Sequence, residues 1–192
     1  MKVSEAIAEI LRREGVTSIC GYPLNPLIET AAAADIRPII TRAERTAGHM
    51  ADAVARVTSG ESIGVYVMQS GPGIANGMGA VQQAFAESVP LLVIPGAPAR
   101  GEAHVTGNFN ATTSLRSFVK SVEPITAGKE VGAVMRRAFT RLRNGRGGPV
   151  LLDEWQRVPA LWDAVRRAVD DGVEPDGGNL QRGLGGHGHH EL

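Results

Sequence analysis

The chain has 192 residues, of which 43% are hydrophobic and 21% charged, and its 20 basic and 20 acidic side chains give no formal net charge. This length is enough for one α/β domain with a buried core and hardly enough for two. The charge balance excludes a nucleic acid or an anionic membrane as the main partner, because both require a positive excess. The single cysteine, Cys20, excludes an internal disulfide. The charged first residues and the short apolar runs predict a cytoplasmic protein outside the membrane.

Helical and extended patterns alternate through the first half of the chain. Val3, Ile7, Ile10 and Leu11 follow helical spacing, and Gly15 stops that helix. The next predicted elements are a short strand at 19–20 ended by residues 21–23, a helix over 27–34, a short buried strand at 38–40, a helix from Glu44 to about 59–60, and a strand over 63–68. The last of these is apolar almost throughout, which is typical of a strand covered on both faces of a parallel sheet.

The second half continues the alternation. Ile74, Met78, Val81 and Phe85 fall on one helical stripe. A buried strand over 91–94, a long polar loop over 101–113, a helix over 131–142, a final strand over 148–152 and a further helix over 160–169 follow. The order predicts a three-layer α/β fold, with a parallel sheet and helices on both faces. We expect one domain over residues 1–170 and a flexible tail rich in glycine and histidine over 171–192.

Two features lie where a predicted strand ends and the next helix begins, which is the usual position of binding and catalytic residues in α/β proteins. Glu44 follows the strand at 38–40, and it is either a first-turn acid favoured by the helix dipole or a functional carboxylate. Gly71-Pro72-Gly73 follows the strand at 63–68, and it is either an ordinary turn or a loop that a ligand approaches closely. This loop lacks the Lys-Ser/Thr of a Walker loop and the third glycine of a dinucleotide fingerprint.

An ordered series of motifs connects these features. It consists of Gly21-Tyr22-Pro23, Arg42-Ala43-Glu44, residues 50–60, residues 70–76, residues 88–94, Arg137-Ala138-Phe139 and residues 145–152. In order and spacing the series resembles the N-terminal, pyrimidine-binding domain of thiamine-diphosphate-dependent enzymes of the acetolactate synthase and 2-oxoacid decarboxylase group. The resemblance covers roughly residues 1–155.

The resemblance implies roles for particular residues. Glu44 corresponds to the glutamate that hydrogen bonds N1′ of the cofactor's aminopyrimidine and favours its imino tautomer. A carboxyl group in a dry cleft is easier to keep protonated than one in water. The cofactor then serves as electron sink in the decarboxylation of a 2-oxoacid. The residues that correspond to the loop and helix start beside the pyrimidine are Ser70, Gly71, Pro72, Gly73 and Asn76.

Other residues match positions that face substrate in such enzymes. Tyr22, Pro23 and Asn25 lie in one such loop, Phe109-Asn110 corresponds to a Phe-Gln pair with the glutamine replaced, and His104 lies in the long loop. Departures from the synthase pattern are Leu24 and Asn25 in place of two glycines, and Ala43 in place of a histidine before the glutamate. These departures concern acetolactate synthesis itself and leave cofactor activation intact.

The family holds the diphosphate and its Mg²⁺ on a separate domain with a Gly-Asp-Gly…Asn signature, and this sequence contains no such stretch. The leading hypothesis is therefore a small subunit of a split enzyme, which pairs with a diphosphate-binding subunit, expected as a heterotetramer, and acts by aldehyde release or carboligation. No metal ligand is expected on this chain. A regulatory or scaffold subunit that retains the fold is the alternative, and a flavodoxin-like nucleotide binder is a third.

Overall fold

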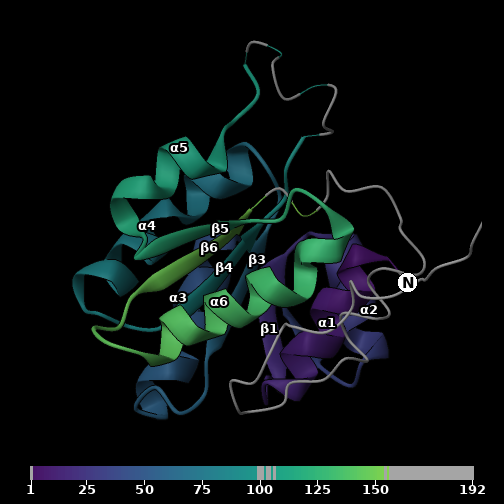
Figure 1. Cartoon of the computed structure of the whole chain (residues 1–192). Coiled ribbons are helices and arrows are strands. Elements are labelled where there is room, and N and C mark those ends of the chain that lie inside the picture. The colour runs from purple at the N-terminus through teal and green to yellow at the C-terminus, as the bar shows by residue number, and fades with distance from the viewer. Residues whose placement is uncertain (1, 99–101, 103–104, 106, 154, 156–192) are drawn as a thin grey trace, which may run out of the picture.

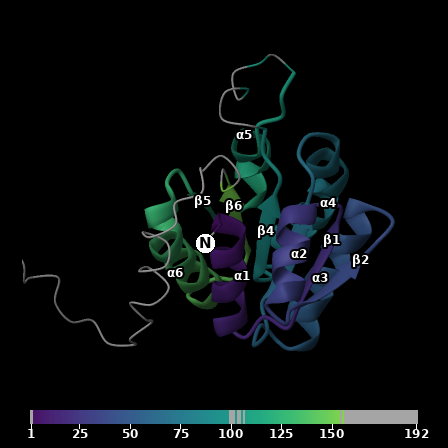
Figure 2. The ribbon, with the colours of Figure 1, turned by 90° about the vertical axis from the view of Figure 1, so that its right-hand side faces the viewer.

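The computed structural model describes residues 2–98, 102, 105, 107–153 and 155, and Figures 1 and 2 show it from two sides. In chain order the elements are α1 (Val3–Arg13), β1 (Ser18–Tyr22), α2 (Asn25–Ala33), β2 (Arg37–Ile40), α3 (Glu44–Val57), β3 (Gly64–Met68), α4 (Pro72–Ala86), β4 (Leu91–Pro95), α5 (Ala111–Leu115), η2 (Arg116–Phe118), β5 (Ser121–Pro124), η3 (Gly128–Glu130), α6 (Val131–Arg143) and β6 (Pro149–Asp153). The predicted alternation of helices and strands is confirmed.

One six-stranded sheet with the order β2-β1-β3-β4-β6-β5 forms the centre of the fold, and all its neighbouring strands are parallel. β3, β4 and β6 are buried along their whole length, because crossover helices cover both faces of the sheet. The predicted parallel three-layer fold is confirmed. β6 lies between β4 and β5, which differs from the 2-1-3-4-5 order of flavodoxin-like sheets.

Two hydrophobic layers lie on the two faces of the sheet. On one face, α1, α2 and α6 contribute residues such as Leu11, Leu27 and Phe139 to a cluster that includes Val65 and Val67 of β3. On the other, α3, α4 and α5 form a second cluster with Tyr66 and Met68 of the same strand. Figures 1 and 2 show the two sets of helices on opposite sides of the strands. The alternation along β3 follows from the pleat of a strand, which points successive side chains to opposite faces.

The first two strands differ from the prediction. The sequence predicts that β1 ends before Gly21, but Gly21 and Tyr22 continue the strand and pair with Val67 and Met68 of β3. A Cβ on Gly21 would lie 2.2 Å from a methyl carbon of Val67, so this glycine serves close strand packing rather than a turn. The prediction that β2 is buried is wrong, because β2 is an edge strand and its Ile40 is 56% exposed.

The polar loop predicted over 101–113 ends earlier than expected. α5 begins at Ala111, and its start is capped by Asn110 Oδ1, which accepts a hydrogen bond from the Thr113 backbone N–H at 2.8 Å. β5 is not predicted, because it has only four residues and no apolar run. α2 starts earlier than predicted, at Asn25, with Pro26 in its first turn.

Two predictions lie outside the described residues: the helix over 160–169 and the flexible tail over 171–192. β6 ends at Asp153, so the six strands of the described residues all lie within the region predicted to form the domain. Among the helices of the described residues, none is both long and apolar enough to cross a bilayer.

Candidate active site

A reversal of strand order marks one place at the carboxyl edge of the sheet. β1 has β2 on one side and β3 on the other, so the connection from β1 to β2 and the connection from β3 to β4 run in opposite directions along the sheet. In open α/β sheets such a switch point opens a crevice outside the carboxyl ends of the strands, where ligands bind. α3 follows β2, packs on both β1 and β3, and begins with Glu44 at this edge. α4 begins at the same edge, directly after β3.

Glu44 is an acid held out of water. Its residue is 6% exposed, and it is the first residue of α3, where the positive end of the helix dipole favours a carboxylate. Asn76 Nδ2, from α4, donates a hydrogen bond to Glu44 Oε2 at 2.5 Å. In the described part of the chain, no other side chain hydrogen bonds this carboxylate. One oxygen is therefore fixed, and Oε1 is left for a further partner.

The Gly71-Pro72-Gly73 turn is shaped around this carboxylate. Gly71 has φ of +68°, which favours glycine, and an added Cβ there would meet nothing within 4 Å. A Cβ on Gly73 would lie 2.6 Å from Gln69 Cγ and 3.1 Å from Glu44 Oε1. Pro72 supplies the first residue of α4. The turn therefore has free space at Gly71, whereas at Gly73 it leaves no room for a side chain beside Glu44.

These features fit the aminopyrimidine that the sequence resemblance implies. A flat heterocycle with ring nitrogens needs a hydrogen-bonding carboxyl group, a wall without side chains and shelter from water. Glu44 Oε1 supplies the hydrogen-bonding carboxyl oxygen, and Gly73 forms the wall without a side chain. The burial of Glu44 provides the shelter from water. The described residues gather no group of three or more His, Cys, Asp or Glu side chains for a metal ion.

The predicted site residues divide into two groups. Short interatomic distances bring together Glu44, Gly73 and Asn76. Ser70 directly precedes the Gly71-Pro72-Gly73 turn, and its backbone N lies 2.9 Å from where a Cβ on Gly96 would lie. These cofactor roles stay predictions, since geometry alone does not test them.

The predicted substrate residues are more scattered. Tyr22 ends β1 at the switch point and is 36% exposed, and Pro23 and Asn25 are exposed beside it. Phe109 packs against the hydrophobic cluster under α4, whereas the side chain of Asn110 is engaged in capping α5. His104 lies outside the described residues. Within the described structure, no hydrogen bond or ion pair joins these side chains to Glu44.

Sequence reasoning missed one residue of this region, Tyr66. The sequence indicates only that Tyr66 belongs to an apolar strand, yet its hydroxyl oxygen is fully buried and has no hydrogen-bond partner within the described structure. Burial, and then the charge of Glu44, raise the pKa of this phenol well above its usual range. A tyrosine among the aliphatic residues of a two-face-buried strand was the signal available in the sequence.

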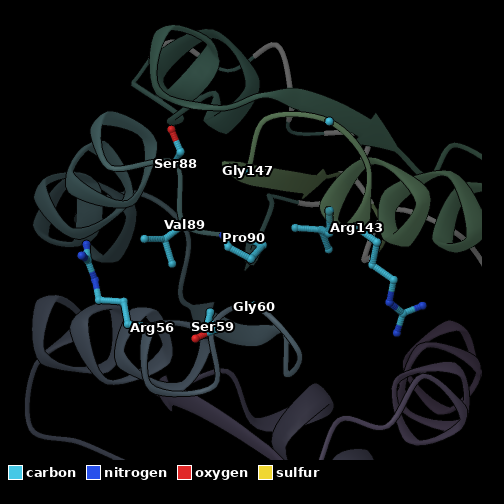
Figure 3. A pocket seen from close by; sticks show the side chains of 11 residues that line it. Arg56, Ser59, Gly60, Ser88, Val89, Pro90, Arg143 and Gly147 are labelled. Atoms are coloured by element: carbon cyan, nitrogen blue, oxygen red, sulfur yellow. The ribbon is translucent and has the colours of Figure 1, made fainter.

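A separate hollow lies at the opposite edge of the sheet (Figure 3). It has a volume of about 410 Å³, and its lining comes from segments that precede β3, β4 and β6. Two arginines line it, but Arg56 donates to Asp52 Oδ2 at 2.6 Å and Arg143 is paired with Glu14. Their guanidinium groups point in opposite directions, away from the centre of the hollow (Figure 3). The two guanidinium groups therefore do not converge on a position in the hollow where a charged ligand could bind.

Comparisons with known proteins identify a family and several relatives that this chain resembles. Residues 1–119 match the family described as "Thiamine pyrophosphate enzyme, N-terminal TPP binding domain". A probable acetolactate synthase large subunit of Methanocaldococcus jannaschii is 35% identical over 161 residues, which are 80% of this chain and 26% of that protein. A glyoxylate carboligase of Escherichia coli O157:H7 is 33% identical over 80% of this chain and 27% of its own. 2-hydroxyacyl-CoA lyase 2 of Danio rerio is 32% identical over 78% of this chain and 24% of its own length. The chain thus spans about a quarter of these relatives.

Proposed function

The chain belongs to the thiamine pyrophosphate enzyme family through its N-terminal TPP-binding domain, and from this premise we propose that it supplies the aminopyrimidine-binding half of an active site that decarboxylates a 2-oxoacid. The observation that carries the proposal is Glu44, a buried carboxylate at a switch point with one oxygen anchored and the other open. Structural acids at helix starts are usually exposed to water, so the burial of this one needs another reason.

The residues of this chain have distinct tasks in the proposal. When bound, thiamine diphosphate supplies the electron sink for decarboxylation. Asn76 fixes Glu44 Oε2, so Oε1 is the atom of this chain that would hold or give up a proton toward the aminopyrimidine. Gly73 lets the ring approach Oε1, because any side chain there would fill the space beside it. The burial of Glu44 excludes the water that would otherwise compete for this hydrogen bond.

The fate of the decarboxylated fragment is release as an aldehyde or transfer to a second carbonyl. The names of the relatives include a synthase, a carboligase and a lyase, which span both outcomes. Tyr22, Pro23 and Asn25 stand at the edge beside Glu44 and are proposed to contact the substrate, together with His104, Phe109 and Asn110.

We further propose that a separate diphosphate-binding subunit completes the site. This partner would hold the diphosphate and its Mg²⁺, and two copies of each chain would form a heterotetramer in the cytoplasm. Co-expression with a chain that carries a Gly-Asp-Gly…Asn stretch, followed by light scattering of the purified complex, tests it. A partner that does not co-purify would contradict the heterotetramer.

Calorimetric titration of that complex with thiamine diphosphate and Mg²⁺ tests the cofactor role. We expect Glu44→Gln to lower 2-oxoacid decarboxylation by about 10²- to 10⁴-fold, the usual loss for a group that moves a proton. Glu61→Gln, the same change at an exposed acid beyond the end of α3, is the matched control and should have no effect. Full activity of Glu44→Gln would refute the assigned role. Complete failure of the unmodified complex to bind the cofactor would favour the alternative, a scaffold subunit.

A further inference from the structure

We propose that Arg116, Lys120, Arg136 and Arg141 form a basic groove along β5 and the outer side of α6, and that this groove binds an acidic segment of a partner polypeptide. The groove lies at the end of the sheet opposite β2, on the left of Figure 2. It is therefore separate from the crevice beside β1 and β3 where Glu44 lies. Three observations carry the proposal: a concentration of positive charge, arginines without partners, and two hollows that share a lysine.

The positive charge of this chain is concentrated in one segment. The whole chain is neutral, but residues 116–146 contain eight Lys or Arg and two Asp or Glu residues. α6, in the middle of this segment, contains no acid. The dipole of a helix favours basic side chains in its last turn, which explains Arg141 and Arg143. It does not explain Arg136 in the middle of α6 or Arg116 in η2.

The two acids of this segment have partners of their own. Glu123 is buried, and its Oε2 accepts a hydrogen bond from Arg137 Nε at 3.0 Å. Glu130 Oε2 accepts a hydrogen bond from the hydroxyl of Thr126 at 2.8 Å. Neither acid therefore neutralises the arginines that remain.

Three arginines of the groove have no counter-charge. Arg116, Arg136 and Arg141 are exposed, and within the described part of the chain their side chains form no hydrogen bond or ion pair. Lys120 adds a fourth positive charge beside them. Burial, and then the charge of Arg141, lower the pKa of Lys120 below its usual range. Like charges held close together destabilise a surface, and an anion bound between them would remove that repulsion.

Two hollows lie along this surface. One has a volume of about 400 Å³ and is lined by Lys120, Arg136, Arg137, Thr140, Arg141 and Asn144. The other has a volume of about 320 Å³ and is lined by Arg116, Val119, Lys120, Ser121 and Val122. Lys120 borders both, and its ammonium group donates to the backbone carbonyl groups of Arg141 and Asn144 at the end of α6. The two hollows therefore adjoin at a lysine that is held in place, and together they form one elongated depression.

The shape and exposure of the groove favour an extended ligand. Water and salt screen exposed charges, so a single small anion would be held weakly here, whereas a chain with several negative charges engages several arginines at once. In an extended polypeptide, alternate side chains face the same side about 7 Å apart. Arg136 and Arg141 are five residues apart on α6, a rise of about 7.5 Å. Acidic side chains at alternate positions of a partner segment would match this spacing.

A nucleic acid is the other extended polyanion, and the surface fits it less well. Proteins that bind single strands stack the bases on exposed aromatic rings. Residues 116–146 contain two aromatic side chains, of which Phe139 is buried and Phe118 packs against a hydrophobic cluster. Binding to a duplex depends on a positive excess, which the neutral chain as a whole does not have. The chemistry of the groove therefore favours an acidic polypeptide.

Fluorescence anisotropy with a labelled acidic peptide tests the proposal on this chain alone. The probe is a fluorescein-labelled peptide of about 12 residues in which glutamate and serine alternate, so that the acids share one side when it is extended. Replacing both Arg136 and Arg141 by glutamine should weaken binding about five- to twentyfold at low salt. Replacing Arg37 and Arg45 by glutamine is the matched control, because it removes the same charge from exposed side chains of β2 and α3. The control should bind the peptide as the wild type does.

Equal binding by the wild type and the Arg136→Gln, Arg141→Gln variant would overturn the proposal, as would an equal loss in the control. An oligodeoxythymidine of similar length that binds more tightly than the peptide would show a nucleic-acid surface instead. Inorganic pyrophosphate that binds as tightly as the peptide would show a small-anion site instead. Arg116→Gln, on a different element, gives a second test if the double variant does not fold, and it should also weaken binding. Glu44→Gln should bind the peptide normally, so failure of the proposed function would leave this inference standing.

Discussion

One methyl group added at Gly77 tests how α4 packs over Tyr66. A Cβ there would lie 2.0 Å from Tyr66 Oη and 3.0 Å from Tyr66 Cζ. The tyrosine cannot move away, because it is 0% exposed and lies between the sheet and two helices. Overpacking of this kind costs about 1–3 kcal/mol, whereas replacing a helical glycine by alanine gains up to about 1 kcal/mol. We expect Gly77→Ala to lower the free energy of unfolding by about 1–2 kcal/mol.

Gly79 on the same helix provides the control. It is exposed, and a Cβ there would meet nothing within 4 Å. Gly79→Ala should therefore raise the free energy of unfolding by about 0.5–1 kcal/mol. Urea unfolding followed by circular dichroism measures both variants, and Tyr66→Phe combined with Gly77→Ala should recover part of the loss by removing the nearest atom. If Gly77→Ala stabilises the protein as much as Gly79→Ala does, the packing described above is wrong.

Three further changes probe separate parts of the fold. Gly73→Ala places a Cβ 3.1 Å from Glu44 Oε1, the oxygen proposed to face the aminopyrimidine. It should weaken thiamine diphosphate binding by about tenfold or more in calorimetry of the proposed complex, while the unfolding free energy changes by less than about 1 kcal/mol. Hydrogen bonds from Arg12 and Arg13 lower the pKa of Glu9 from 4.5 to about 2. A depressed carboxyl pKa adds stability above the unfolded value and loses it as pH falls through the folded one. The difference in unfolding free energy between wild type and Glu9→Gln, at most about 1 kcal/mol for exposed partners, should therefore disappear between about pH 5 and about pH 2 in urea titrations. Lys120→Met removes the ammonium that donates to the last carbonyl groups of α6, and thermal unfolding should show a loss of about 1 kcal/mol.

The order of elements could be predicted from the sequence because strong local patterns specify it. The apolar strand at β3 and the helical stripe of Ile74 and Val81 allow little choice. The failures come from tertiary context. Whether β2 lies at the centre or the edge depends on strand order, which no local pattern encodes, and β5 becomes a strand by pairing with β6 rather than by its own composition.

The candidate site likewise has residues that could be predicted from the sequence and a packing arrangement that could not. Glu44, Gly73 and Asn76 were selected from a motif series, and the structure brings all three into contact across two helices. The convergence of Gly48 and Gly77 on the Tyr66 ring could not be predicted, because it depends on how closely α3 and α4 approach each other over β3. The predicted substrate residues are more dispersed, because Tyr22 ends β1, Asn25 begins α2 and Asn110 caps α5.

Hydrogen–deuterium exchange at the thiazolium C2 of bound thiamine diphosphate tests the central claim most directly. This exchange reports proton removal from the cofactor without requiring any knowledge of the substrate. In the complex with the diphosphate-binding partner, the wild-type chain should accelerate exchange over free cofactor, and Glu44→Gln should lose about 10²-fold or more of that rate at saturating cofactor. Exchange in Glu44→Gln as fast as in the wild type would contradict the role of Glu44 in cofactor activation.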